Sequence, residues 1–227
     1  SAERERQIVS DASHEFRTPL AIIQTRLELA QRQAKTLEEM QVDVSAAQKA
    51  LGRLSALATS MLELSRIDAQ NEPGRAAVAD LERELGDAVD RGRQRVAARD
   101  IYIDFTSETT TRDQWVSVSD ADFGRVCDNL ISNALAALDK TGVIDLRIVQ
   151  GADNLTLTVS DDAGGMDESY LPYALDRFSR QNVARTPGGA GLGLAIVAGI
   201  ASTSGGTATL HNNPGIGLEV EVTFPLV

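Results

Sequence analysis

The sequence VIDLRIVQGADNLTLTVS, residues 143–160, decides the fold of the larger part of the chain. Two β-rich runs, 143–150 and 155–160, flank the turn-forming residues Gly-Ala-Asp-Asn, which is the pattern of a β-hairpin. Residues 207–211 and 218–224 repeat this pattern around an Asn-Pro-Gly turn. The sequence therefore predicts two hairpins that contribute to one sheet.

Helical segments are interspersed with these strands. Periodicity predicts helices near 78–98 and 122–138, and the alternation of Ile101, Ile103 and Phe105 predicts a further strand. Residues 166–190 contain prolines and glycines with weak periodicity, which is typical of a functional lid or a disordered loop. We therefore predict an α/β layer domain over residues 73–227.

The preceding part, residues 1–72, is predicted to be helical. Its apolar residues recur at steps of three and four, first in Ile8, Ala12, Phe16, Leu20, Ile23, Leu27 and Ala30, then in Val44, Ala47, Leu51, Leu54, Ala58, Met61 and Leu64. Two long helices joined around residues 33–38 would form an antiparallel hairpin. Because a single hairpin buries only a seam, we expect two copies to pair into a four-helix bundle as a homodimer. The alternative is a monomeric hairpin packed on the second domain.

Composition limits the classes of function. The 227 residues carry a formal charge of −11, and 23 of the 33 acidic side chains lie beyond residue 70, so sequence-independent nucleic-acid binding is disfavoured. No apolar run approaches the ~18 residues that cross a bilayer, so we expect a soluble piece. The single cysteine, Cys127, excludes an intrachain disulfide, and two histidines with one cysteine are too few for an ordinary zinc site.

His14 lies on the polar face of the first predicted helix. Its neighbours one helical turn away are polar, including Thr18 four residues on, and Glu15 follows it directly. A lone helical histidine is more often an ordinary surface or core residue. An exposed imidazole beside a carboxylate is nevertheless a plausible nucleophile.

Three polar or glycine-rich features could bind a nucleotide. Asn129 and Asn133 share one helix face, either as solvated amides or as oxygen ligands for Mg²⁺ and phosphate. Asp161 ends a strand before a glycine turn, where it could read an exocyclic amine or belong to an ordinary turn. The spaced glycines 189–193 lead into an apolar helix, whose N-terminus favours phosphate.

Residues 13–20, Ser-His-Glu-Phe-Arg-Thr-Pro-Leu, resemble the H-box of sensor histidine kinases. The resemblance implies that ATP phosphorylates a ring nitrogen of His14 and that Glu15 assists as base. It also implies that Thr18 helps to place water when the domain dephosphorylates a response regulator.

The asparagines and the first glycine turn are similar to further boxes of the same family. Asn129 and Asn133 fit the N-box, which implies metal ligation by Asn133, and Asp161 and Gly165 fit the first glycine box with Asp161 as adenine reader. The chain departs from the family pattern at three positions, Ala136, Ala137 and Ala163. Family members often carry a lysine and an aromatic at the first two positions and a glycine at the third; Lys140 is a candidate replacement for that lysine.

Residues 176–180 resemble the F-box, and the later glycines resemble the second glycine box. The resemblance implies that Phe178 anchors the ATP lid and that Arg180 reaches the terminal phosphate, with Arg185 a lesser candidate. Solvated loop charge is the alternative for both arginines. The nucleotide-binding glycines implied by the second box are Gly189, Gly191 and Gly193.

Together the boxes identify the chain as similar to the catalytic core of a sensor histidine kinase. This implies a helical dimerisation and phosphotransfer domain followed by a Bergerat (GHKL) ATP-binding sandwich, using ATP and Mg²⁺. The expected partners are a second copy and a response regulator receiver domain. The expected location is cytoplasmic, with anchoring to the inner membrane through a segment absent here. Alternatives are a degenerate kinase that docks a regulator, a protein that acts mainly as a phosphatase, and, less well supported, another ATPase of this fold.

Overall fold

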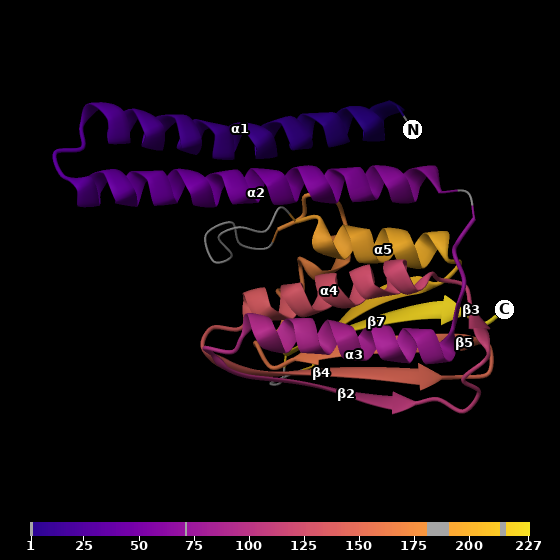
Figure 1. Ribbon diagram of the computed structural model, residues 1–227. Helices are drawn as coiled ribbons and strands as arrows, with labels where there is room; N and C mark the ends of the chain where they lie inside the picture. The colour runs from indigo at the N-terminus through magenta and orange to yellow at the C-terminus, as the bar shows by residue number, and fades with distance from the viewer. Residues whose placement is uncertain (1, 71, 181–190, 214–216) are drawn as a thin grey trace.

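The computed structural model describes residues 2–70, 72–180, 191–213 and 217–227. Two long helices, α1 (Ala2–Arg32) and α2 (Leu37–Ala69), form an antiparallel hairpin (Figure 1). Thr36 caps the start of α2, because its hydroxyl accepts a hydrogen bond from the Glu39 N–H at 3.2 Å. The Glu39 carboxylate in turn accepts from the Lys35 N–H at 2.7 Å, and this paired capping fixes where the second helix begins. The predicted helical hairpin is confirmed.

The hairpin buries only part of its apolar stripes. Ala30 and Ala47 are buried, and an ion pair of 2.8 Å between Arg26 Nη1 and Asp43 Oδ1 joins the helices. Several other stripe residues face solvent: the exposed fractions are 47% for Leu20, 43% for Leu27, 36% for Val44 and 53% for Leu51. One copy of the hairpin therefore leaves an apolar surface uncovered.

The rest of the chain is built on a five-stranded mixed sheet with strand order β2-β4-β5-β7-β6. The strands are β2 (Asp100–Glu108), β4 (Thr141–Gln150), β5 (Asn154–Asp161), β6 (Thr207–Asn213) and β7 (Gly217–Pro225). Strands β4 and β5 pair as one hairpin and β6 and β7 as another, as predicted. The pairing of β2 with β4 is parallel, which the local sequence pattern does not indicate.

Three helices cover one face of the sheet: α3 (Val78–Arg95), α4 (Asp120–Ala137) and α5 (Gly193–Thr203) (Figure 1). The core lies between these two layers, where Phe123 and Phe224 meet edge to face with ring centroids 5.8 Å apart. The opposite face of the sheet carries mostly polar side chains and a shallow hollow lined by Asp104, Asp145 and Arg147 among others. None of the predicted site residues lines this hollow.

Short elements complete the domain. Strands β1 (Ala76–Ala77) and β3 (Trp115–Val116) pair antiparallel, and a single 3₁₀ turn, η1 (Leu171–Tyr173), interrupts the predicted loop. No helix in the described ranges is long and apolar enough to cross a membrane.

The second half of α2 packs on the α/β domain, so that α2 lies between α1 and α5 (Figure 1). Leu64 and Ile67 of α2 are each 4% exposed. Gly199 of α5 leaves room for this contact, since a Cβ there would lie 3.2 Å from Ile67 Cγ2. The helix that carries His14 is thus on the far side of α2 from the sheet.

Candidate functional site

The predicted phosphoacceptor and its neighbours lie together on α1. The His14 side chain is exposed, as expected, and Glu15 beside it is half-buried. The Thr18 hydroxyl donates to the His14 carbonyl at 3.4 Å, so Thr18 lies one turn along the same surface. An accessible imidazole next to a carboxylate and a hydroxyl can accept a group from a partner that approaches from solvent.

Asp161 is the last residue of β5 and continues the alternation that sends Leu155, Leu157 and Val159 toward the helices. Its carboxylate is therefore turned inward, and the residue is 6% exposed. Oδ1 accepts from the Ala163 N–H at 3.0 Å and from the Leu218 N–H at 3.4 Å. Burial raises the pKa of Asp161 above its ordinary value, and the two backbone N–H groups only partly offset this.

The two glycines in the turn after Asp161 differ in what lies beside them. Gly164 (φ +93°) and Gly165 (φ +80°) both adopt the left-handed region that favours glycine. A Cβ on Gly164 would meet nothing within 4 Å, whereas a Cβ on Gly165 would lie 2.6 Å from Asn212 Oδ1. Ala163 does not have a positive φ, since Phe178 is the only non-glycine residue with one in the described ranges. The alanine in place of the family's first glycine therefore causes no backbone strain.

Asn129 and Asn133 lie on one face of α4, as predicted, but their amides differ in surroundings. Asn129 Nδ2 donates to the Arg125 carbonyl at 2.8 Å, which turns its Oδ1 toward α5. This oxygen is 3.0 Å from the position that a Cβ on Gly193 would occupy. The half-buried Asn133 side chain has no hydrogen-bond partner within the described ranges and is free to bind a ligand.

The start of α5 offers a phosphate-binding end. No side chain caps this helix, and the first N–H groups of any helix have no intrahelical partner. These groups and the positive end of the helix dipole attract phosphate. Gly193, the first residue of α5, is half-buried beside Asn129.

Gly191 lies against Phe178 and Ser179 near the start of α5, so the residues that flank 181–190 are in contact. Gly191 has φ +67°, and a Cβ there would lie 2.5 Å from the Ser179 carbonyl oxygen and 2.9 Å from Phe178 C. Phe178 itself has φ +62°, an uncommon conformation for a bulky side chain, and packs against the core. Arg180 is half-buried here. Gly189 and Arg185 lie outside the described residues.

The candidate nucleotide site is thus assembled from the end of β5, one face of α4 and the start of α5. Ala136 and Ala137 are exposed near the end of α4, so neither a lysine nor an aromatic ring extends from these positions. Lys140 is exposed in the next turn. The sequence did not single out Asn212, because the strand predicted over residues 207–211 ended just before it, whereas β6 runs to Asn213.

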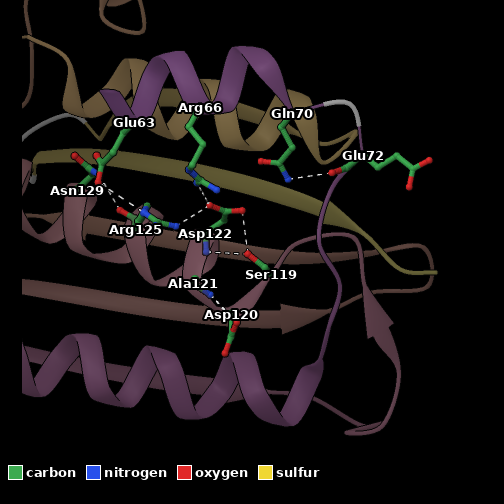
Figure 2. A network of polar contacts seen from close by, with 10 residues as sticks. All are labelled: Glu63, Arg66, Gln70, Glu72, Ser119, Asp120, Ala121, Asp122, Arg125 and Asn129. Carbon is green, nitrogen blue, oxygen red and sulfur yellow. Dashed lines mark hydrogen bonds and ion pairs between the residues drawn. The ribbon is translucent and has the colours of Figure 1, made fainter. Parts of the chain in front are cut away.

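A polar network joins α2 to the start of α4 (Figure 2). Asp122 is nearly buried and accepts from Arg66 of α2, from Arg125 at 2.9 Å and from the Ser119 hydroxyl at 2.9 Å. Arg125 also approaches Glu63 of α2, with Nε and Oε1 3.7 Å apart. These contacts fix α2 against the domain that carries the candidate nucleotide site.

A second ion pair attaches α2 to the segment before residue 181. Arg177 Nη2 donates to both carboxylate oxygens of Asp68, at 2.6 and 2.8 Å. Because Arg177 directly precedes Phe178, the end of α2 and the F-box segment are held together.

Comparison with known families agrees with this geometry. Residues 95–227 match the family described as "Histidine kinase-, DNA gyrase B-, and HSP90-like ATPase", and residues 4–70 match the "His Kinase A (phospho-acceptor) domain". The first match covers more than half of the chain. The chain belongs to this ATPase family and, with both domains in this order, has the make-up of a two-component sensor histidine kinase core.

Individual relatives are consistent with that assignment. The chain is 31% identical over 223 residues to the "Signal transduction histidine-protein kinase/phosphatase MprB" of Mycolicibacterium vanbaalenii, covering 93% of this chain and 44% of that protein. It is 30% identical over 224 residues to the "Signal transduction histidine-protein kinase BaeS" of Escherichia coli, covering 97% and 47%. The chain therefore spans less than half the length of these curated relatives.

Among solved structures, the histidine kinase AdeS of Acinetobacter baumannii has the same fold. The TM-score is 0.70 at 20% identity, and the match covers 94% of this chain and 96% of that one. The predicted fold class, a helical hairpin followed by an α/β sandwich ATPase domain, is confirmed.

Proposed function

We propose that this chain is a histidine kinase that transfers the γ-phosphoryl group of ATP to His14 and then to an aspartate of a response regulator. The observation that carries the proposal is an exposed His14 on α1 together with a separate group of elements in contact, in which Asp161 ends β5 and the asparagines of α4 lie near the uncapped start of α5. We place the boundary between the phosphoacceptor and ATP-binding parts at residues 72 and 73, between the end of α2 and β1.

Different residues of the nucleotide site bind the base and the phosphates. The Asp161 carboxylate accepts a hydrogen bond from the exocyclic amine of adenine, and Gly164 leaves open space beside it for the base. Gly191 and Gly193 bring backbone N–H groups at the start of α5 to the phosphates. Gly189 belongs to the same set by its position in the motif. Phe178 fixes the segment that carries Arg180, whose cation offsets charge on the terminal phosphate.

The asparagines of α4 fit Mg²⁺, because the free amide of Asn133 and the inward oxygen of Asn129 are hard oxygen donors beside a phosphate-binding helix end. We assign direct metal ligation to Asn133. The chain has a net charge of −11, which disfavours the binding of an anionic nucleotide. Mg²⁺ bound at Asn133 would neutralise part of the charge on the phosphates.

The chemistry at α1 is a displacement at phosphorus. A ring nitrogen of His14 forms a bond to the γ-phosphorus as the bond to the bridging oxygen breaks, and ADP leaves with the electron pair. Glu15 accepts the proton from the other ring nitrogen. Because α2 lies between α1 and the docked ATP-binding domain, transfer requires either that this domain leave α2 or that the domain of a second subunit reach His14 (Figure 1).

The uncovered stripe of the hairpin supports a homodimer. Leu20 and Leu27 on α1 and Val44 and Leu51 on α2 are all at least a third exposed, although the repeat predicts burial. A second copy would cover them in a four-helix bundle. We propose that the whole protein is anchored in the inner membrane through a segment outside these residues and works on the cytoplasmic side.

Phosphatase activity toward the regulator is the second candidate function. Thr18 lies one turn from His14, where its hydroxyl can place a water molecule, and a relative is named as a kinase/phosphatase. Thr18→Ala should abolish dephosphorylation of a phosphorylated receiver domain but leave His14 phosphorylation intact. Unchanged dephosphorylation would contradict this role.

The kinase proposal is tested by incubating the chain with γ-labelled ATP and Mg²⁺. The chain has two histidines, so His14→Ala is compared with His211→Ala as a matched control. We expect acid-labile, base-stable label on the wild type and on His211→Ala, none on His14→Ala, and none with excess chelator. Absence of label on a folded, dimeric wild type would favour the degenerate regulator-docking alternative.

A further inference from the structure

Asn212 of β6 forms two hydrogen bonds to the backbone of one residue in the glycine turn. Its Oδ1 accepts from the Met166 N–H at 2.8 Å, and its Nδ2 donates to the Met166 carbonyl at 2.6 Å. The side-chain amide therefore satisfies both backbone polar groups of Met166, as a neighbouring strand would in a sheet. A third contact, from Nδ2 to Glu168 Oε1 at 3.3 Å, extends along the same segment.

The turn that Asn212 holds contains two glycines, which makes it costly to order. Two successive residues, Gly164 and Gly165, have positive φ, and glycine loses more conformational freedom on ordering than any other residue. The space beside Gly165 is filled by the Asn212 amide, with Oδ1 at 2.6 Å and Cγ at 3.2 Å from the Cβ position. Gly165 therefore makes room for a protein side chain, whereas Gly164 next to it faces open space.

The same β6–β7 hairpin also positions the carboxylate of Asp161. Leu218, the register partner of Asn212, donates its N–H to Asp161 Oδ1 at 3.4 Å. Gly217 permits this approach, because a Cβ there would lie 1.7 Å from the Asp161 carbonyl oxygen. The β6–β7 hairpin thus contacts both the Asp161 carboxylate, through the Leu218 N–H, and the turn that follows it, through Asn212.

We propose that Asn212 is a positioning residue for the base-binding end of the nucleotide site. It acts by holding the turn at Gly164 and Gly165 in place against Asp161, so that the carboxylate and the open face at Gly164 meet the base together. The inference rests on the proposed function, because it presumes that Asp161 reads the exocyclic amine of adenine.

The experiment compares the dissociation constants of ATP and inosine triphosphate, which has a carbonyl in place of the exocyclic amine. Asn212→Ala should weaken ATP binding about tenfold and inosine triphosphate binding much less, so the preference for ATP falls. The matched control is Asn213→Ala, the next asparagine on the strand, whose side chain bonds Glu219 at 3.4 Å instead of the turn. It should keep the wild-type preference.

A second variant separates positioning from folding. Asn212→Asp keeps the size and the acceptor for the Met166 N–H but loses the donor and places a carboxylate beside Glu168; it should also lose preference for ATP. A folded Asn212→Ala or Asn212→Asp with the wild-type ratio of the two constants would overturn the inference and leave the kinase proposal intact. A wild type that binds neither nucleotide would defeat both.

Discussion

Replacing Arg66 with alanine removes the ion pair that joins α2 to the start of α4. The Asp122 side chain is 8% exposed and that of Arg66 is 46% exposed, so the pair is partly screened by water. Exposed pairs contribute about 0.2–1 kcal/mol. Bonds from a charged donor to a nearly buried carboxylate contribute more. We therefore expect the Arg66–Asp122 pair to stabilise the packing of the ATP-binding domain on α2 by ~1 kcal/mol. Its loss would change the ratio of docked to released domain about fivefold.

Because α2 separates α1 from the docked domain, weaker docking should make His14 easier to reach. We expect Arg66→Ala to raise the initial rate of His14 labelling by up to about fivefold when release of the domain limits the rate. The assay is label incorporation from γ-labelled ATP in the first minute at saturating nucleotide. Arg53→Ala is the matched control, since this exposed arginine of α2 forms no ion pair in the described part of the chain.

A double-mutant cycle with Asp122→Ala isolates the pair from the other bonds of Asp122. Asp122→Ala alone also removes contacts to Arg125 and Ser119, so its own effect on the free energy of unfolding should be larger than that of Arg66→Ala. The coupling energy between Arg66 and Asp122, taken from the free energies of unfolding of the wild type, both single variants and the double variant, should be ~1 kcal/mol. The reasoning is refuted if the coupling is zero, or if Arg66→Ala labels no faster than Arg53→Ala while the coupling is present.

Three further outcomes follow from the site and the hairpin. Gly191→Ala places a methyl group at φ +67° and 2.5 Å from the Ser179 carbonyl oxygen, so calorimetry should show ATP binding weakened at least about tenfold; wild-type affinity would contradict the packing argument. Because burial raises the pKa of Asp161, its carboxylate should protonate, and ATP affinity fall, at a higher pH than for an ordinary aspartate. Asp161→Asn should lose this part of the pH dependence. Leu51→Glu should give a monomer in sedimentation experiments. Val42→Glu, on the opposite side of α2 from Leu51, should remain a dimer. Equal behaviour of the two variants would count against the four-helix bundle.

The same raised pKa has a consequence for stability. Above the folded pKa the protein holds Asp161 ionised in a buried position, which costs stability relative to the unfolded chain. That cost decreases as the pH falls through the folded pKa and is absent below the unfolded one. The contribution of Asp161 to stability should therefore increase on mild acidification, while its contribution to ATP binding decreases.

Periodicity was enough to predict the elements that have strong local signals. The steps of three and four around Leu20 and Leu51 predicted the hairpin, and the Asn-Pro-Gly turn predicted the pairing of β6 with β7. The two-residue strands β1 and β3 could not be predicted, because a period of two needs a longer run to be visible. The parallel pairing of β2 with β4 depends on a crossover through α4 that no local pattern encodes.

The sequence pointed to candidate site residues where a residue type itself indicates chemistry, as at His14, Asp161 and Asn133, and their roles stay predictions. It did not indicate what surrounds the glycines. Gly165 resembles a residue that lets a nucleotide approach, yet the space beside it is taken by Asn212, which is 47 residues away in sequence. Likewise, Arg66 and Asp122 form a pair only because the domain packs on α2. Contacts between distant segments depend on the tertiary fold and leave no local signal.

The most direct test of the central claim is to locate the phosphoryl group on the chain itself. After incubation with Mg²⁺ and ATP, trypsin digestion at neutral pH should give residues 7–17 as one peptide, in which His14 is the only histidine, and residues 186–227 as another, which contains His211. Mass spectrometry should find an acid-labile phosphoryl group on the first peptide, at His14. A phosphoryl group on the second peptide, or an acid-stable one on Ser10 or Ser13, would contradict the account.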